Sequence, residues 1–356
     1  MERMDREEFF ERLSVLDEAR LKKALWNLYW RGAAPMRQRI EAELDPDGLH
    51  RQRAAAEVVD PKWTLSEVRE FVGLARSGAY LAGDRRVSPR ERTRWRFTFR
   101  RLVKDAEVAL REDDVADGAA AMALLVDLGQ EMRDRWYFRS EDPVEAARVV
   151  VSDEVALLWT RVLDRLGFDE FARSAAPQLL RWESEFGWTR TGFGRIRAQE
   201  TSLAEVLGRM LSAPDMWVTF ANRYLEALDA VADARAAASG RGRYLSGRDP
   251  ERRAGDLVEW HLLLLDRLFG GDAEDRLDRL AAHSALSGSE MTYFRAQLAN
   301  RRGDLTTARR LATEALERLP GHPGYLRFAR EIDAPLPVRA EDVALSRVER
   351  LMTNDG

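Results

Sequence analysis

Helix-period spacing of apolar residues runs through almost the whole chain, and this pattern limits the possible folds more than any other feature. Alternating β-branched runs are nearly absent, and residues 149–151 (VVV) are too few to indicate a sheet. Helix-start signals recur, as in residues 88–91 (SPRE), where a serine cap, a first-turn proline and a capping-box glutamate follow one another. We therefore predict an all-α fold of stacked antiparallel helical hairpins with short connections.

Changes in helix length and composition divide the chain into four predicted regions. Residues 1–83 form an N-terminal helical subdomain, and residues 84–238 form a central helical domain. Residues 239–249 contain three glycines and are the best candidate for a linker. Helical hairpins follow at 250–332, and a tail at 333–356 ends in a short helix. Glycines predict several helix ends, because they adopt the left-handed C-cap conformation without strain; they are Gly32, Gly78, Gly167, Gly240 and Gly270.

Composition excludes several classes of protein. The chain has no cysteine, so disulfides, cysteine-ligated metals and thiol nucleophiles are excluded. No apolar run approaches the ~20 residues that a membrane helix needs, and residues 1–8 lack a signal-peptide pattern. We expect a cytoplasmic protein with no membrane contact. Arginine supplies 53 of the 57 basic residues, a bias that we attribute to GC-rich coding.

Catalytic motifs are missing from the sequence. The four histidines form no metal-binding pair, and no nucleophile elbow occurs. His261 lies in a strongly apolar helix and is predicted to be a hydrogen-bonded core residue. We expect no catalytic, cofactor or metal residues, although an enzyme whose site is hidden in a single sequence remains a third possibility. The glycine-containing segment 187–197 is interpreted as an ordinary connection rather than a phosphate-binding loop.

One segment has a recognisable repeat pattern. Small residues at Ala296, Ala308 and Ala315 occupy positions where two antiparallel helices approach closely, and Gly303-Asp304 lies at the turn. On these residues, 293–323 resembles a tetratricopeptide repeat, and weaker hairpin patterns surround 271–272 and 106–126. The resemblance implies a superhelix of helical hairpins that binds another protein or a peptide.

Two sets of residues are candidates for contacts with a protein partner. By analogy with the repeat family, Tyr293, Arg295, Arg301 and Arg302 line a concave surface. The helix at 21–32 is apolar nearly all round, and its Trp26, Tyr29 and Trp30 are either central in the N-terminal subdomain or part of an interface. We thus favour a non-catalytic interaction protein, a scaffold or adaptor.

The alternative function is contact with nucleic acid through the most basic helix. Residues 85–104 contain eight arginines and one lysine against a single glutamate. The helix has an apolar stripe at Trp95, Phe99 and Leu102, with Phe97 outside that stripe. Pairing with the acidic segment 105–170 is the favoured interpretation, and phosphate binding is the alternative. The phosphate-binding candidates are Arg90, Arg92, Arg94, Arg96, Phe97, Arg100 and Arg101.

Overall fold

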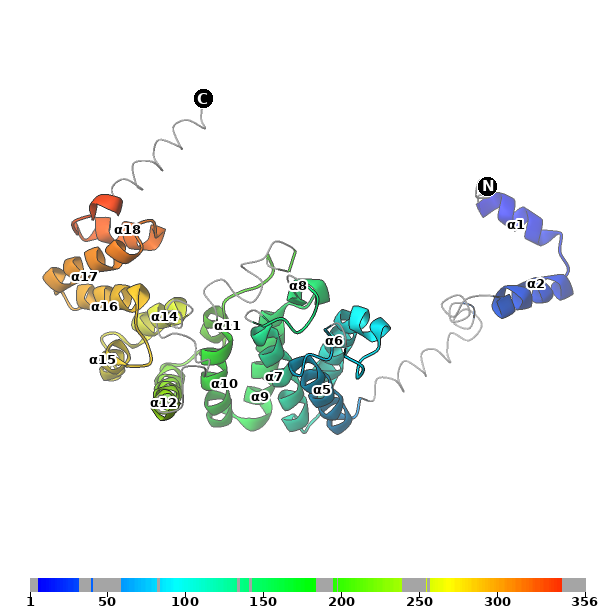
Figure 1. Cartoon of the computed structure of the whole chain (residues 1–356), viewed down its shortest axis with the longest axis horizontal. Coiled ribbons are helices and arrows are strands. Elements are labelled where there is room, and N and C mark those ends of the chain that lie inside the picture. Colours follow the sequence, from blue (N-terminus) through cyan, green and yellow to red (C-terminus); the bar gives the residue numbers. More distant parts are fainter. Residues whose placement is uncertain are drawn as a thin grey trace, which may run out of the picture. The chain divides into compact units, whose positions relative to one another are not determined.

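The computed structural model describes residues 6–31, 40, 59–81, 84–132, 135–140, 143–183, 195–196, 198–238, 254 and 257–340. Within these ranges every regular element is an α-helix (Figure 1), which confirms the predicted all-α class. The chain forms two compact units, residues 1–59 and residues 60–356. Of the helices that the structure describes, none is both long and apolar enough to cross a membrane.

The first unit contains α1 (Arg6–Ser14) and α2 (Glu18–Arg31). The carboxylate of Asp17 accepts a hydrogen bond from the backbone N–H of Arg20 at 2.7 Å, so it satisfies one of the free donors at the start of α2. Most side chains of α2 are exposed, including those of Trp26 and Trp30. In this unit the structure therefore describes two helices with little buried apolar surface of their own.

The second unit begins with four helices that share one aromatic core. They are α5 (Pro61–Arg76), α6 (Pro89–Ala109), α7 (Ala116–Glu131) and the short α8 (Pro143–Ala147). α5 packs on both α6 and α7. The predicted apolar stripe of α6 is buried, and its Trp95 ring stacks on Phe138 with 4.2 Å between centroids. Phe138 also stacks on Phe71 of α5, with 5.9 Å between the ring centroids.

The close crossing of α6 and α7 depends on a glycine. A Cβ on Gly118 would lie 2.8 Å from backbone atoms of both Ala109 and Leu110. Real side chains do not approach a backbone so closely, so the end of α6 and the start of α7 meet only because this residue has no side chain.

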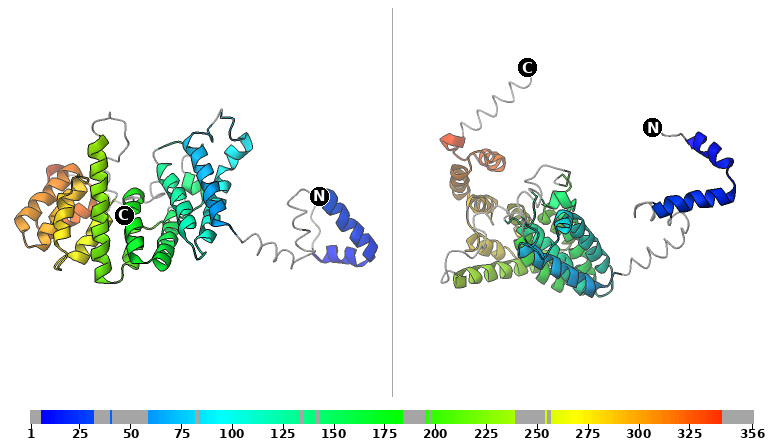
Figure 2. Two further views of the ribbon diagram at one scale, coloured as in Figure 1. Left: turned by 90° about the horizontal axis from the view of Figure 1, so that it is seen from below. Right: turned by 45° about the vertical axis from the view of Figure 1, so that its right-hand side comes forward.

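The middle of the second unit consists of four more helices, and a tryptophan of one of them donates a hydrogen bond to α7. They are α9 (Val151–Leu166), α10 (Phe168–Trp182), α11 (Leu203–Met210) and α12 (Pro214–Ala238). Gly167 separates α9 from α10 with a φ of 82°, as predicted for a C-cap glycine. The indole N–H of Trp182 donates to Asp127 of α7 at 2.6 Å. α12 packs on α10 and on the helices that follow, α14 and α15, and it stands between them in the left view of Figure 2.

The last part of the unit contains the predicted repeat. Its helices are α14 (Val258–Leu268), α15 (Asp275–Ala282), α16 (Ser289–Arg301), α17 (Leu305–Arg318) and α18 (Pro323–Glu331). α16 and α17 form a tightly packed antiparallel hairpin in which Ala296, Ala308 and Ala315 are fully buried. Gly303 makes the turn with a φ of 79°. Packed helical hairpins are thus confirmed at the positions that the small residues predict.

His261 of α14 is a core residue, as predicted. Its side chain is 1% exposed, and its Nε2 forms a 2.8 Å hydrogen bond with the hydroxyl of Tyr224 on α12. Burial lowers the pKa of His261 to about 3, so the ring is neutral at physiological pH. The pair connects α12 to α14 without placing a charge in the core.

Among the described residues, four arginines connect helices by donating from Nε to a backbone carbonyl at the C-terminal end of another helix. The last carbonyls of a helix have no partner within it, and a cation there also interacts favourably with the helix dipole. The bonds join Arg100 to Ala147 of α8 (2.7 Å), Arg161 to Leu110 after α6 (2.8 Å), Arg295 to Ala281 of α15 (2.7 Å), and Arg309 to Ile332 after α18 (2.6 Å).

The unit boundary differs from the one expected at residue 83. α5 buries Val68, Phe71 and Val72 in the core that it shares with α6 and α7, and the two compact units divide at residues 59 and 60. The divisions expected at 238 and 250 stay predictions. The linker candidate 239–249 and the terminal helix beyond residue 340 lie outside the described residues.

Candidate interaction surfaces

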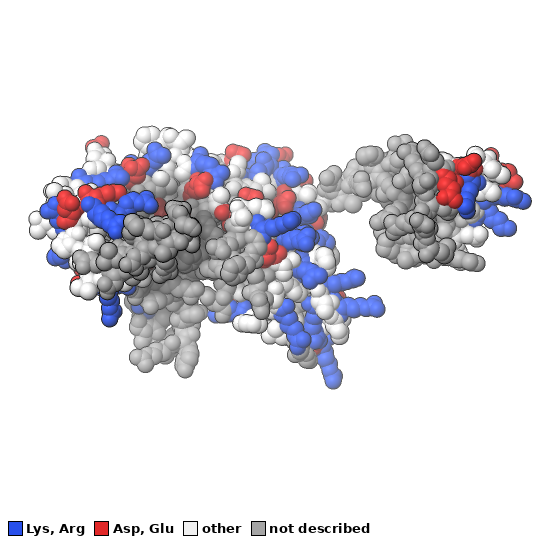
Figure 3. Space-filling view, turned by 90° about the horizontal axis from the view of Figure 1, so that it is seen from above, with Lys and Arg blue, Asp and Glu red and all other residues white. Residues whose placement is uncertain are grey.

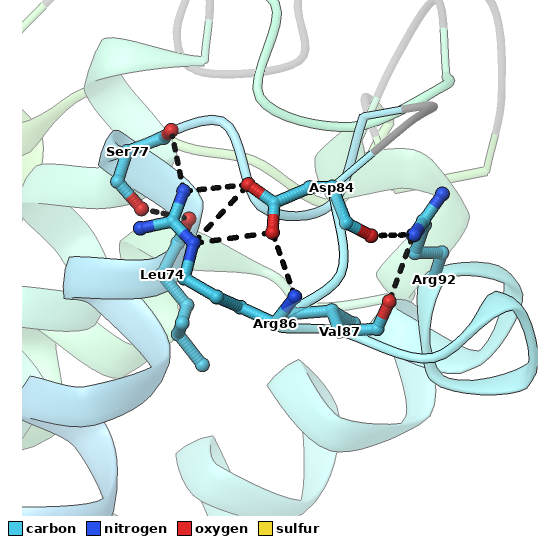
Figure 4. A network of polar contacts seen from close by, with 6 residues as sticks. All are labelled: Leu74, Ser77, Asp84, Arg86, Val87 and Arg92. Atoms are coloured by element: carbon cyan, nitrogen blue, oxygen red, sulfur yellow. Dashed lines mark hydrogen bonds and ion pairs between the residues drawn. The ribbon is translucent and has the colours of Figure 1, made fainter.

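The start of α6 is fixed by a network of polar contacts around residues 84–92 (Figure 4). Arg86 forms an ion pair with Asp84 at 2.6 Å and also donates to the carbonyl of Ser77, just after α5. Arg92 donates to the carbonyls of Val87 and Asp84. The hydrogen bonds from Arg86 lower the pKa of Asp84 to about 2, so the carboxylate stays charged at neutral pH. This turn connects the end of α5 to the first turn of α6.

The predicted capping box at the same helix start is present. The Ser88 hydroxyl accepts from the backbone N–H of Glu91 at 3.3 Å, and the Glu91 carboxylate accepts from the backbone N–H of Ser88 at 2.9 Å. Glu91 is therefore occupied at the helix end, although it lies among the arginines in the sequence.

Three of the predicted phosphate-binding arginines form contacts within the chain. Arg92 and Arg100 donate to backbone carbonyls, as described above. Arg101 pairs with Glu67 of α5 at 3.0 Å and with Asp105 at 2.8 Å. These contacts hold α6 against α5 and α8.

The remaining cations of α6 lie on its solvent-facing side. Arg90, Arg94, Arg96 and Lys104 are exposed, and none of their side chains forms a hydrogen bond or an ion pair within the part of the chain that the structure describes. Phe97 lies among them with 53% of its surface exposed, and the guanidinium of Arg96 lies 4.9 Å from its ring centroid. Figure 3 shows lysines and arginines gathered over the α5–α6 end of this unit.

The sequence favours pairing of this helix with the acidic segment 105–170. Among the described residues only Asp105 of that segment pairs with α6. Other carboxylates of the segment pair elsewhere: Asp113 with Arg165 at 3.0 Å, Asp127 with Arg181 at 3.2 Å, and Glu131 with Arg76 at 2.6 Å. Local charge balance in the sequence therefore overstated the neutralisation of α6, because the fold places these acidic groups beside other arginines.

The C-terminal candidates have contacts within the chain. Tyr293 is only 8% exposed and stacks on Tyr325 with 4.5 Å between ring centroids. Arg295 donates to the carbonyl of Ala281. Arg301 pairs with Asp266 at 3.0 Å, whereas Arg302 pairs with Glu274 at 2.8 Å and Asp278 at 2.6 Å. These residues hold α16 to neighbouring helices, and their contact with a partner stays a prediction.

A groove lies along α17, on a surface that the sequence analysis did not single out. It has a volume of about 610 Å³ and a lining of mixed charge. Polar residues with helical spacing at 306, 310, 313 and 317 indicate this face in the sequence, whereas the repeat analogy indicates the first helix of the hairpin. The lining residues are Thr306, Arg309, Arg310, Thr313, Glu314, Glu317 and Pro335.

The aromatic candidates on α2 are unevenly exposed. Trp26 and Trp30 are 58% and 71% exposed, whereas Tyr29 is half-buried. Trp26 stacks on both neighbours, with 5.7 Å to the Tyr29 centroid and 5.8 Å to that of Trp30. Of the two alternatives for this helix, the exposure of the tryptophans is in keeping with an interface, and that role stays a prediction.

Two carboxylates at the start of α9, the buried Glu200 and the half-buried Glu154, were not found from the sequence. Glu200 accepts hydrogen bonds from the backbone N–H groups of Val151 and Ser152 at 2.8 and 2.9 Å, and it therefore caps the helix from a distant segment. Glu154, one turn further on, has a pKa raised to about 8, first by burial and then by Glu107. The described residues contain no group of three histidine or acidic side chains arranged to hold a metal ion.

The segment 187–197 lies outside the described residues except for Arg195 and Ile196. The backbone N–H groups of both residues donate to the carboxylate of Glu145, at 3.1 and 3.0 Å. Comparison with known proteins found no matching family model, no matching curated protein and no matching solved structure.

Proposed function

We propose that this chain is a non-catalytic interaction protein of helical-repeat type, related in design to tetratricopeptide arrays, that holds a segment of a partner protein in the groove along α17. The observation that carries the proposal is the groove itself. It lies on a rigid hairpin whose inner face is filled by alanines, which leaves the outer polar face of α17 available. Stacked hairpins commonly present extended binding surfaces in this way.

The chemistry of the groove suits a peptide with both charged and apolar side chains. Arg310 and Arg318 each lie 3.7 Å from Glu314, and all three side chains are at least 39% exposed. Such exposed pairs contribute little to stability, so a partner's charged groups exchange with them at small cost. The Thr313 hydroxyl donates to the carbonyl of Pro335 at 2.7 Å, which holds the segment after α18 against one wall.

The test is affinity capture from the native host after nuclease treatment, with three baits. The wild-type chain is compared with Arg310→Ala/Glu317→Ala in the groove and with the matched control Arg327→Ala/Glu331→Ala on the exposed side of α18. We expect a protein that the wild type and the control retain and that the groove variant loses. Titration of that purified partner should then show at least a tenfold loss of affinity in the groove variant. Equal capture by all three baits would refute a role for the groove. A cytoplasmic location stays a prediction.

A further inference from the structure

We propose that the solvent-facing side of α6 binds single-stranded nucleic acid, with its cations on the phosphates and Phe97 stacked on a base. This site is separate from the groove along α17 and does not depend on the function proposed above.

Helix geometry places the relevant side chains in one row. Positions 90, 94, 97, 101 and 104 follow the i, i+4, i+7 spacing of a single helix face. The opposite face is fixed, since Trp95, Phe99 and Leu102 are each at most 4% exposed. At a rise of 1.5 Å per residue, the row extends roughly 21 Å along α6. A strand that follows this row would pass several phosphates in succession.

The charge of the row remains positive after its internal contacts are counted. Arg90, Arg94, Arg96 and Lys104 have no acidic partner among the described residues. The nearby carboxylates are already engaged: Glu91 in the capping box, and Glu67 and Asp105 by Arg101. Uncompensated surface cations attract a phosphate backbone, and binding releases its counterions.

A further exposed cation lies where α8 meets α6. Arg100 of α6 donates to the carbonyl of Ala147, and the next residue, Arg148, is exposed with a φ of 57°. Few non-glycine residues adopt this left-handed conformation. Arg148 therefore adds positive charge beside α6 on a segment that the Arg100 bond holds in place.

The exposed aromatic ring favours a single strand over a duplex. Phe97 lies in the middle of the row, and no core residue of the described chain covers it. A base of a single strand offers its face to such a ring, whereas a paired base in a duplex has both faces covered by its neighbours. Arg96 beside the ring adds a cation that stacks on bases as well as contacting phosphate.

The site is also rigid before any ligand arrives. The network around Asp84 fixes the start of α6, and the stacking of Trp95 on Phe138 fixes its first half against the core. The protein therefore loses little conformational entropy when a strand binds.

The experiment measures binding of the full-length chain to labelled 20-nucleotide oligothymidylate and oligouridylate, and to a 20-base-pair duplex, by fluorescence anisotropy. We expect the single strands to bind more tightly than the duplex at 100 mM salt. A plot of log K against log salt should have a slope near −3, for about four phosphates neutralised. Tighter binding to the duplex, or no binding at 50 mM salt, would overturn the proposal.

Charge-reversal variants locate the site. The triple variant Arg90→Glu/Arg94→Glu/Lys104→Glu should weaken single-strand binding at least about 30-fold and reduce the salt slope by about 2. The matched control changes net charge equally at three exposed arginines far along the chain, Arg327→Glu, Arg330→Glu and Arg339→Glu. The control should retain most of the affinity. An equal loss in both triples would show that net charge alone drives binding, and would overturn the proposal.

Phe97→Ala tests stacking separately from charge. It should weaken single-strand binding about tenfold, which corresponds to about 1.4 kcal/mol, with the salt slope unchanged. Phe97→Trp should restore the affinity, and Phe10→Ala, which truncates a phenylalanine of similar exposure in the first unit, should have no effect. All these side chains are exposed, so circular dichroism should show that the variants stay folded. If Phe97→Ala binds as the wild type does, or if polyglutamate or anionic vesicles compete as well as unlabelled single strands, the proposal fails.

Discussion

The half-buried Glu154 near the start of α9 leads to a quantitative prediction for the effect of pH on stability. Burial is the largest cause of its raised pKa, followed by the charges of Glu107 and Asp153. The carboxyl group is therefore largely neutral at pH 7, and its hydrogen bond with Glu107 favours the protonated form. Replacing Glu154 with glutamine keeps the size and a donor but removes the titration.

The sign follows from proton linkage. The pKa is about 8 in the folded chain against an ordinary value of 4.5, so the folded state holds the proton more strongly than the unfolded state. The contribution of this proton to the free energy of unfolding is fully present below pH 4.5 and is lost as the pH rises to about 8. Each pKa unit corresponds to about 1.4 kcal/mol, and partial exposure to water reduces the total, so we expect a loss of about 2–4 kcal/mol across this range.

Urea unfolding at pH 5 and at pH 8.5, followed by circular dichroism, measures the effect directly. Glu154→Gln should gain about 2–4 kcal/mol over the wild type between the two pH values. Glu112→Gln is the matched control for the loss of one surface carboxylate, because the Glu112 side chain is exposed and forms no hydrogen bond or ion pair in the described chain. A pH-independent difference for Glu154→Gln would refute the reasoning.

Three further predictions concern stability. Gly118→Ala should destabilise the chain by about 1–3 kcal/mol, because its Cβ meets the backbone of the α6 terminus; Gly73→Ala, which has open space around its Cβ, should stabilise α5 by about 0.5–1 kcal/mol. Thermal melts that rank these two variants in the opposite order would contradict this explanation. Tyr224→Phe leaves Nε2 of His261 without its hydroxyl partner, and chemical denaturation should show a loss of about 1–3 kcal/mol. Ser88→Ala removes the cap of α6 and should lower stability by about 0.5–2 kcal/mol, measured in the same way; no change would show that the capping box does not stabilise this helix.

The sequence predicts local features of this fold well because short-range physics determines them. The capping box at Ser88, the left-handed glycine at 167 and the tight turn at Gly303 all follow from conformational preferences of a few residues. Buried small residues such as Ala308 are also predictable, because the spacing of two packed helices requires them.

The candidate sites are less predictable, because they depend on which distant residues meet. The opposite net charges of α6 and residues 105–170 predict ion pairs between them. In the structure, however, Asp127 pairs with Arg181 and Glu131 pairs with Arg76. The repeat analogy predicts that Arg302 lines a concave surface, but in the structure Arg302 pairs with Glu274 just before α15 and with Asp278 within it. Glu200 caps α9 from nearly fifty residues away, and no local pattern indicates that contact.

The arginines that donate to distant helix ends have a consequence for how the helices align. Apolar stripes supply most of the attraction between two helices, but the hydrophobic effect itself has no preferred direction. A guanidinium bonded to a terminal carbonyl is directional, because moving by one turn leaves that carbonyl without its partner. These bonds therefore help to fix the register between neighbouring helices. Arginine, whose abundance the sequence analysis attributes to coding, thus helps to fix the arrangement of helices in a chain that has no cysteine and whose described residues contain no strand.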